Sequence, residues 1–364
     1  MECRSKDELL LMSVQRITFL NVNEKIKLLK NLDSFNALAL MSLEDMISFC
    51  GRRLSRVKWD GKENLRRAEK ELALLKAKRI GYLLYTDAEY PALLKETVDA
   101  PFMLFYRGDP SCLRGRTVSV VGTRRITPEG KRAAVEFARN AVLDGCTVVS
   151  GLAYGVDAAS HTGAVDVWYN LRDGKAWSGA VGSGTSCGTE PLDVSLLGRT
   201  AAVLPCGCDA VTPVSHGRLA GRIIESGGCI ISEYAPGTEA ANWRFVHRNR
   251  IIAALSPAVV VIQAPAGSGA LITAQFALEY NRDVMFHRAA FGQEAFTVRK
   301  FSDSELKLRF DRGQVSKSKI ENTPEHYLEA GAPVIENYAD YLRCLREVPG
   351  IRSIKTEQLE LFQV

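Results

Sequence analysis

The stretch TVSVVGTRRITPEG, at residues 117–130, decides the fold class of this chain. Residues 117–121 form a continuous run rich in β-branched residues, which is typical of a strand buried on both faces of a parallel sheet. A glycine and two arginines follow. Thr127 and Pro128 then open a helical pattern, because threonine is a good N-cap and proline suits the first helical position. The stretch predicts a strand, a turn and a helix, in that order.

The same alternation of short apolar runs and helical patterns continues along the chain. Further predicted strands lie at residues 147–150, 200–204, 229–232, 259–263 and 283–286. Strands that alternate with helices pair in parallel through right-handed crossovers. The sequence therefore predicts an α/β fold with a doubly wound, mostly parallel sheet.

Before residue 79 the apolar spacing is helical throughout, with Ser42 as a helix start and Gly51 as a helix end. We predict a small all-α domain over residues 1–78, an α/β domain over residues 79–346 and a C-terminal tail over residues 347–364. Two stretches break the strand–helix rhythm, near residues 166–197 and 294–320. Both are predicted to be loop insertions at the sheet margin, the second partly disordered.

The composition is that of a globular protein with a mild positive charge. The chain has 364 residues and a formal net charge of +5, which permits binding to a polyanion without requiring it. The basic stretch from Arg52 to Arg79 is either a solvated helix face or a secondary phosphate-contacting surface.

The nine cysteines are scattered, so we expect reduced, structural thiols. No stretch approaches the ~20 apolar residues of a membrane helix, and we expect a cytoplasmic protein.

Small-residue turns follow several predicted strands. Ligands bind outside the carboxyl ends of the strands in an open α/β sheet, where glycine lets a backbone approach and helix N-termini offer N–H groups. We expect Asn249 to cap the helix that follows it, with arginines near that helix end. Several such turns on one rim suit an extended polyanion. The candidate binding residues are Gly122, Thr123, Arg124, Arg125, Ser150, Gly151, Gly155, Arg248, Asn249, Arg250, Ser268, Gly269 and Thr273.

Each of these features also has a purely structural interpretation. A glycine after a parallel strand can serve only to let a helix pack closely, and the arginines can form ion pairs with Glu233 or Asp157. His161 and His247 are interpreted as hydrogen-bonding framework residues. The sequence has no Gly-x-Gly-x-x-Gly, His-Glu-x-x-His or Walker motif, and Cys206 and Cys208 alone do not make a zinc site. It therefore predicts no catalysis, no cofactor and no metal ion.

Five segments, in order, resemble the DprA/Smf family of DNA-processing proteins. Residues 90–109 are similar to the segment that leads into the family's core, and residues 122–124 are similar to its Gly-Ser-Arg element. Residues 150–161, 248–252 and 268–274 resemble its second, third and fourth signatures. The similarity runs from about residue 81 to residue 286 and resumes at residues 327–341.

The resemblance implies an extended Rossmann-like fold, usually dimeric, that binds single-stranded DNA and helps load the RecA recombinase during natural transformation. It makes Arg124 the first expected phosphate contact, followed by Arg248 and Arg250. The turns at Gly151 and Gly269 would supply backbone N–H groups.

This chain departs from the family pattern at a few positions. Thr212-Pro213 and His216 stand in place of the family's Tyr-Pro and Asn, and Phe245-Val246 stands in place of its Phe-Pro. Residues 287–290 replace a Val-Pro-Gly segment.

Three functions remain open at this point. The first is a non-catalytic single-strand binder and recombination mediator, in which Tyr154, Trp243 or Phe245 either stack on bases or simply pack. The second is a nucleotide-binding sensor or hydrolase on a related Rossmann-like fold. Nucleotide-hydrolysing relatives carry a Pro-Gly-Gly-x-Gly-Thr-x-x-Glu loop, whereas residues 264–270 here lack its glutamate. The third is an interaction scaffold without DNA binding.

Overall fold

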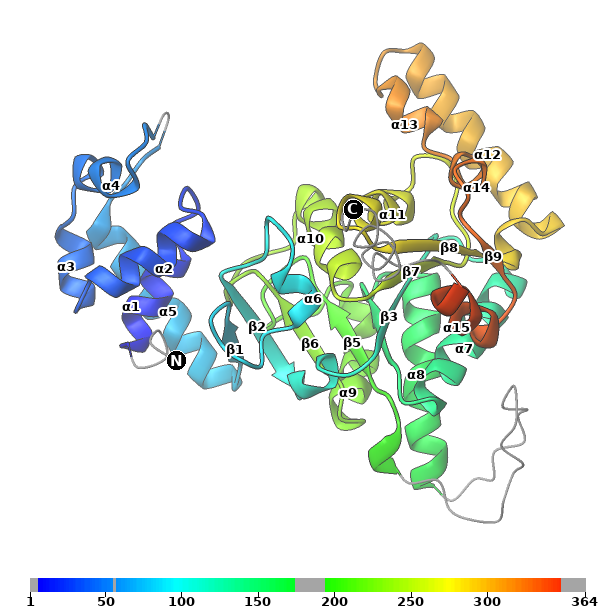
Figure 1. The fold of residues 1–364 in the computed structure, drawn as a ribbon, viewed down its shortest axis with the longest axis horizontal. Coiled ribbons are helices and arrows are strands. Elements are labelled where there is room, and N and C mark those ends of the chain that lie inside the picture. Colours follow the sequence, from blue (N-terminus) through cyan, green and yellow to red (C-terminus); the bar gives the residue numbers. More distant parts are fainter. Residues whose placement is uncertain (1–5, 55–56, 174–193, 348–364) are drawn as a thin grey trace, which may run out of the picture.

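A single sheet runs through the centre of the chain in the computed structural model, which describes residues 6–54, 57–173 and 194–347 (Figure 1). Within these residues the sheet has nine strands in the order β1-β2-β6-β5-β4-β3-β7-β8-β9. The strands are β1 (Gly81–Leu84), β2 (Met103–Gly108), β3 (Thr117–Val121), β4 (Thr147–Ser150), β5 (Thr200–Val203), β6 (Cys229–Ser232), β7 (Ala258–Val261), β8 (Asp283–His287) and β9 (Val334–Ile335).

The parallel core of the sheet confirms the predicted α/β fold. Strands β3 to β8 correspond to the six predicted runs, and β6, β5, β4, β3, β7, β8 and β9 pair in parallel. Three strands toward the two edges of the sheet were not predicted. β1 and β2 form an antiparallel pair that extends the sheet beyond β6, and the two-residue β9 lies at the opposite edge.

Helices cover both faces of the sheet. On one face lie α7 (Pro128–Leu143), α8 (Val156–Arg172), α9 (Gly217–Glu225) and α15 (Tyr338–Glu347). On the other lie α6 (Ala92–Lys95), α10 (Asn242–Ala254), α11 (Gly269–Glu279) and α14 (Pro324–Glu329). Short 3₁₀ turns occupy Pro110–Leu113, Val194–Leu196, Val214–His216 and Arg288–Ala290. As expected, Thr127 caps α7 and Pro128 is its first residue.

Five helices precede the sheet, as the apolar spacing predicts. They are α1 (Glu8–Gln15), α2 (Val22–Asn31), α3 (Phe35–Leu40), α4 (Leu43–Cys50) and α5 (Gly61–Lys78). Ser42 and Asp45 form a capping box at the start of α4, and Gly51 ends it in the left-handed conformation, with φ of 66°. Both are the predicted start and end signals.

The helical region packs directly on the β1–β2 side of the sheet (Figure 1). Phe102 and Leu204 share one apolar cluster with Leu28 and Leu75 of the helices. Lys25 is buried at this junction, where its Nζ donates to Gln15 O over 2.8 Å, and burial lowers its pKa to about 8.

Two sequence predictions about residues 294–320 and 245–250 are wrong. The polar stretch near 294–320 is not a loop but the helices α12 (Gln293–Asp311) and α13 (Lys317–Glu321). The helix predicted to start after Asn249 begins at Asn242, so residues 248–250 lie in its middle. No capping side chain marks this start in the sequence, because Ala241 occupies the N-cap position.

The insertion predicted near residues 166–197 is divided in the structure. Its first residues belong to α8, which extends to Arg172, and residues 174–193 lie outside the described residues. The seven cysteines that the structure describes are free thiols. Among the helices of the described part, none is long and apolar enough to cross a bilayer.

Candidate functional site

A pocket of about 540 Å³ opens where the chain reverses its direction across the sheet. From β3 the chain proceeds through β4 and β5 to β6, and it then crosses back to β7 on the other side of β3. At this point the helices that follow two neighbouring strands lie on opposite faces of the sheet, and a crevice opens between them. The walls are the turn after β3, the start of α8, the face of α10 and the first turn of α11.

Two arginines from the turn after β3 stand at the rim of this pocket. Arg124 and Arg125 are both exposed, and neither has an acidic partner within the described residues. The guanidinium carbon of Arg124 lies 5.4 Å from the ring centroid of Phe245, which holds the cation against α10. The rim therefore presents two cations free to meet an anion.

The first turn of α11 forms the opposite wall. Ser268 occupies the N-cap position, but its hydroxyl does not cap the helix. Its Oγ is buried and has no hydrogen-bond partner in the described part of the chain. The first N–H groups of a helix have no intrahelical acceptor and carry a partial positive charge. Asn249 Nδ2 donates to Gly269 O over 3.1 Å and ties α10 to this turn.

Arg248 lies below the rim and is almost fully buried. Its guanidinium donates to Gly151 O over 2.7 Å and also to Val203 O. Burial lowers its pKa to about 10, and the nearby carboxylate of Asp157 opposes that shift. Burial likewise raises the pKa of Asp157, while Arg248 opposes it. Arg248 thus remains a buried cation that forms the floor of the pocket.

Three of the predicted glycines are needed for close packing. A Cβ on Gly122 would lie 2.4 Å from Val156 Cγ2, and one on Gly151 would lie 2.7 Å from Arg248 Nη2. Gly155 has φ of +79°, and a Cβ there would lie 2.2 Å from Thr123 O. Gly269 differs, because its nearest neighbour would be Asn249 Nδ2 at 3.8 Å. The structural interpretation thus holds for the first three, while Gly269 leaves open space at the pocket.

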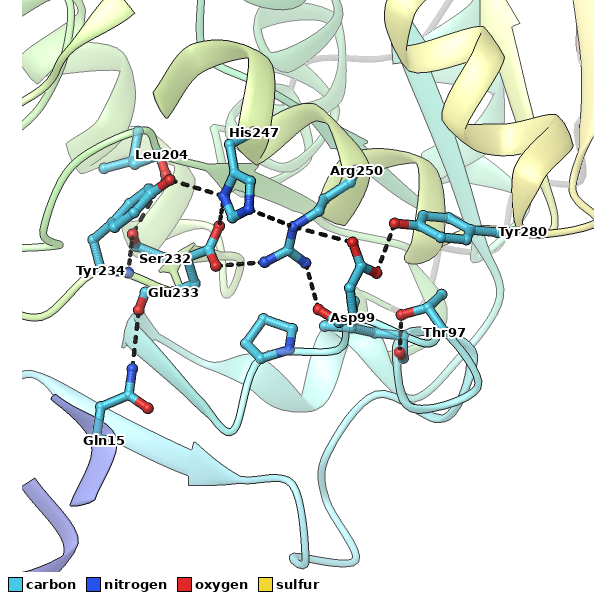
Figure 2. A network of polar contacts seen from close by, with 12 residues as sticks. Gln15, Thr97, Asp99, Leu204, Ser232, Glu233, Tyr234, His247, Arg250 and Tyr280 are labelled. Atoms are coloured by element: carbon cyan, nitrogen blue, oxygen red, sulfur yellow. Dashed lines mark hydrogen bonds and ion pairs between the residues drawn. The ribbon is translucent and has the colours of Figure 1, made fainter. Parts of the chain in front are cut away.

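Arg250 points away from the pocket and forms an ion pair with Glu233, which is the structural interpretation given above for the arginines. Figure 2 shows its guanidinium between Glu233 and Asp99. Arg250 Nη2 lies 2.5 Å from Glu233 Oε2, and Arg250 Nε lies 3.5 Å from Asp99 Oδ2. His247 Nδ1 also lies 3.0 Å from Glu233 Oε1. The Arg250 side chain is 5% exposed and does not line the pocket. Its surroundings are those of a framework residue.

The pocket gathers most of the residues predicted from sequence. Ser150, Gly151, Gly155 and Arg250 are not in its lining. The predicted residues that do line it are Gly122, Thr123, Arg124, Arg125, Arg248, Asn249, Ser268, Gly269 and Thr273.

Sequence reasoning missed part of the α10 wall. Asn242, Phe245, Val246 and Asn249 line the pocket at spacings of i, i+3, i+4 and i+7, which put them on one helix face. Only Asn249 was predicted as a binding residue, and Phe245 was named as a possible stacking residue. The pattern becomes visible once the helix is known to begin at Asn242. Trp243 and Tyr154, the other two possible stacking residues, are exposed and outside the lining.

Two other expectations concern groups near the pocket. The N-terminus of α7 was expected to offer free N–H groups, but Thr127 Oγ1 accepts from Gly130 N and Thr127 N donates to Gln263 Oε1. His161 is a buried framework residue as expected, with Nδ1 2.7 Å from Thr200 Oγ1. Burial lowers the pKa of His161 to about 3, so this imidazole is neutral at physiological pH.

Relatives of known name match this chain over most of its α/β part. Protein Smf of Borreliella burgdorferi is 29% identical over 300 residues, which cover 82% of this chain and 85% of that protein. Protein Smf of Synechocystis sp. is 38% identical over 56% of this chain and 44% of its own length. DNA processing protein DprA of Bacillus subtilis is 32% identical over 58% of this chain and 62% of its own length. The match thus spans about half to two thirds of the last two relatives.

Two solved structures share the fold. DNA processing protein A from Streptococcus pneumoniae superposes with a TM-score of 0.60 at 24% identity, over 94% of this chain and 98% of that chain. DNA processing protein A from Helicobacter pylori, a structure described for its mode of binding single-stranded DNA, gives a TM-score of 0.51 at 22% identity, over 74% and 98%.

The chain is an open, doubly wound α/β protein with an arginine-rimmed pocket at the switch point of its sheet. The model of the family "DNA recombination-mediator protein A" matches residues 81–300, which is more than half of the chain. The protein belongs to this DprA/Smf family of recombination mediators.

Proposed function

We propose that this chain binds single-stranded DNA at the rim of the switch-point pocket. The observation that carries the proposal is the position of two exposed arginines, without an acidic partner among the described residues, across one pocket from the first turn of α11. Arg124 and Arg125 supply two positive charges, and the turn at Ser268 supplies N–H groups and a hydroxyl. Phosphate groups bind such combinations of cations and helix N-termini. Phe245, beside Arg124, offers a ring to a base.

Family membership supports the rest of the proposal. The bound strand is handed to RecA during natural transformation, and the working form is a homodimer. The protein acts by binding and placement and not by covalent chemistry. The family assignment and a pocket lined by arginines and a helix N-terminus together favour this function over a nucleotide sensor or hydrolase on the same fold.

The test is fluorescence anisotropy of a labelled oligothymidine, single- and double-stranded, across a salt series. We expect the single strand to bind preferentially, with log affinity falling by about 0.7 per phosphate contact for each unit of log salt. Arg124→Glu should abolish this binding. Arg114→Glu is the matched control, because Arg114 is exposed but precedes β3 at the amino end of the strand.

Two outcomes would overturn the proposal. One is a wild-type protein that shows no binding at low salt. The other is a pair of results: a mononucleotide binds in the pocket, and Arg124→Glu binds DNA as tightly as wild type does. The RecA step has a separate test, in which wild type but not Arg124→Glu speeds RecA filament formation on a strand coated with single-strand-binding protein.

A further inference from the structure

The helices α12 and α13 form an arm, residues 293–321, that extends beyond the sheet (Figure 1). Little of it is buried: Ala295 and Leu306 are its buried residues. Several large apolar side chains of α12 are exposed, among them Phe296 at 58% and Phe301 at 66%. Exposed apolar side chains of this kind, grouped on one helix, mark a surface that contacts another molecule.

The arm is anchored to the turn that leads into the pocket wall. Ala266 N donates to Asp303 Oδ1 of α12 over 3.0 Å, and Gly267 N donates to Asn322 O, just after α13, over 2.8 Å. A Cβ on Gly267 would lie 2.7 Å from Lys319 O. Ser268, which lines the pocket, is the next residue. The arm is therefore continuous with the pocket rim.

Three lysines of the arm surround this anchor point. Lys300 and Lys307 lie one turn before and one turn after Asp303, on the same helix face. The stem of Lys319 packs at Gly267. None of the three has an acidic partner in the part of the chain that the structure describes. By contrast, Arg299 pairs with Glu325, and Lys317 pairs with Glu321.

Aromatic side chains lie on the same face of α12 as two of these lysines. Phe296, Lys300, Asp303, Lys307 and Phe310 recur every three or four residues, so they form one stripe along the helix. Phe296 is 58% and Phe310 is 38% exposed. Interleaved cations and aromatic rings suit a single strand, in which the phosphates meet the cations and unpaired bases stack on rings.

We propose that the α12–α13 arm is a second contact surface for single-stranded nucleic acid. The strand leaves the pocket past Ser268 and runs along the Lys300–Lys307 stripe, with Lys319 at the junction. This inference rests on the proposed function, because the pocket is where the strand enters.

The test compares short and long strands on the full chain. Oligothymidines of about 6 and about 20 nucleotides are titrated against wild type, Lys300→Glu/Lys307→Glu and Arg124→Glu over a salt series. We expect the double variant to bind the short strand within about twofold of wild type and the long strand at least about tenfold more weakly. Its salt slope on the long strand should fall by about 1.4, which corresponds to two phosphate contacts.

The matched control is Arg114→Glu/Arg346→Glu, which makes the same charge change at two exposed positions, one before the amino end of β3 and one on α15. The proposal is overturned if this control weakens long-strand binding as much, or if the arm variant loses affinity equally for both lengths. It is also overturned if light scattering shows that the arm variant binds less only because two copies of the chain separate. If the proposed binding at the pocket is itself wrong, the result differs, because wild type then binds neither the short nor the long strand.

Discussion

The guanidinium of Arg248 lies against the backbone of Gly151 and donates to its carbonyl oxygen over 2.7 Å. This contact joins α10 to the end of β4 beneath the pocket. It makes Arg248 a buried cation, at a position where the family resemblance implies a phosphate contact. It also explains why position 151 requires glycine, since the space that a Cβ would need is filled by the guanidinium.

The first prediction concerns Gly151→Ala. The added methyl group must displace Arg248 from its two carbonyl partners, so the free energy of unfolding should fall by about 2 kcal/mol or more. Gly269→Ala is the control, because its Cβ meets nothing closer than 3.8 Å, and a change of less than about 0.5 kcal/mol is expected. Urea denaturation measures both. Equal losses in the two variants would contradict this account of the turn.

The second prediction concerns the buried ion pair of Arg250. Glu233→Gln leaves the guanidinium without its closest carboxylate in a site where that side chain is 5% exposed, which should destabilise the fold by about 3 kcal/mol. Glu96→Gln removes the partner of Arg282 at a position 61% exposed and should cost less than about 1 kcal/mol. Thermal unfolding of both variants provides the comparison. If Glu233→Gln proved as mild as Glu96→Gln, the pair would not be a structural support.

The third prediction concerns the pH dependence of stability. The folded protein holds the pKa of His161 at about 3, against the ordinary value of 6.5. Between these values the unfolded chain binds more protons than the folded protein. The stability from neutral His161 is therefore present above pH 6.5 and is lost progressively as the pH falls toward 3, by up to about 1.4 kcal/mol per pH unit.

We accordingly expect His161→Gln to have a flatter stability profile than wild type from neutral pH into the acid range. Denaturant titrations at a series of pH values measure the slope. His326→Gln, at an exposed position, should follow wild type. Parallel slopes for wild type and His161→Gln would show that this buried imidazole does not set the acid limit.

The fourth prediction distinguishes two aromatic residues of α10. Phe245 lines the pocket beside Arg124, whereas Trp243 is 58% exposed outside it. Phe245→Ala should weaken single-strand binding by about 1–3 kcal/mol, the usual contribution of one stacked base. Trp243→Ala should change it little. Anisotropy at one fixed salt concentration suffices, and a larger loss at Trp243 would place the bases on the outer face of the helix.

Much of the fold is predictable because its signals are local. A run such as residues 147–150 is apolar enough to specify a central strand wherever it lies in the sheet. β1 is different, since it is half exposed and is ordered by pairing with β2. α12 was missed for a related reason: its composition is polar, and its anchor is the bond from Ala266 N to Asp303, which no local pattern contains.

The candidate site was predictable in its location and less so in its details. Turns after β3 and β7 follow from the strand pattern, and they supply Arg124 and Ser268 as expected. The sequence cannot show which of Arg248 and Arg250 lies at the pocket. Two positions apart on one helix, the two side chains point to different faces, and the local sequence does not reveal what packs against each face. Their partners, Gly151 and Glu233, become neighbours only when distant segments pack together.

The pocket lies at the point where the chain reverses across the sheet, so its existence depends on the path of the backbone and not on any rim side chain. Selection can therefore exchange the residues at positions 124, 245 and 268 without closing the crevice. A protein engineer can use the same freedom: new rim residues can be introduced for a different anionic ligand, as long as Gly122, Gly151, Gly155 and the buried Arg248 stay in place.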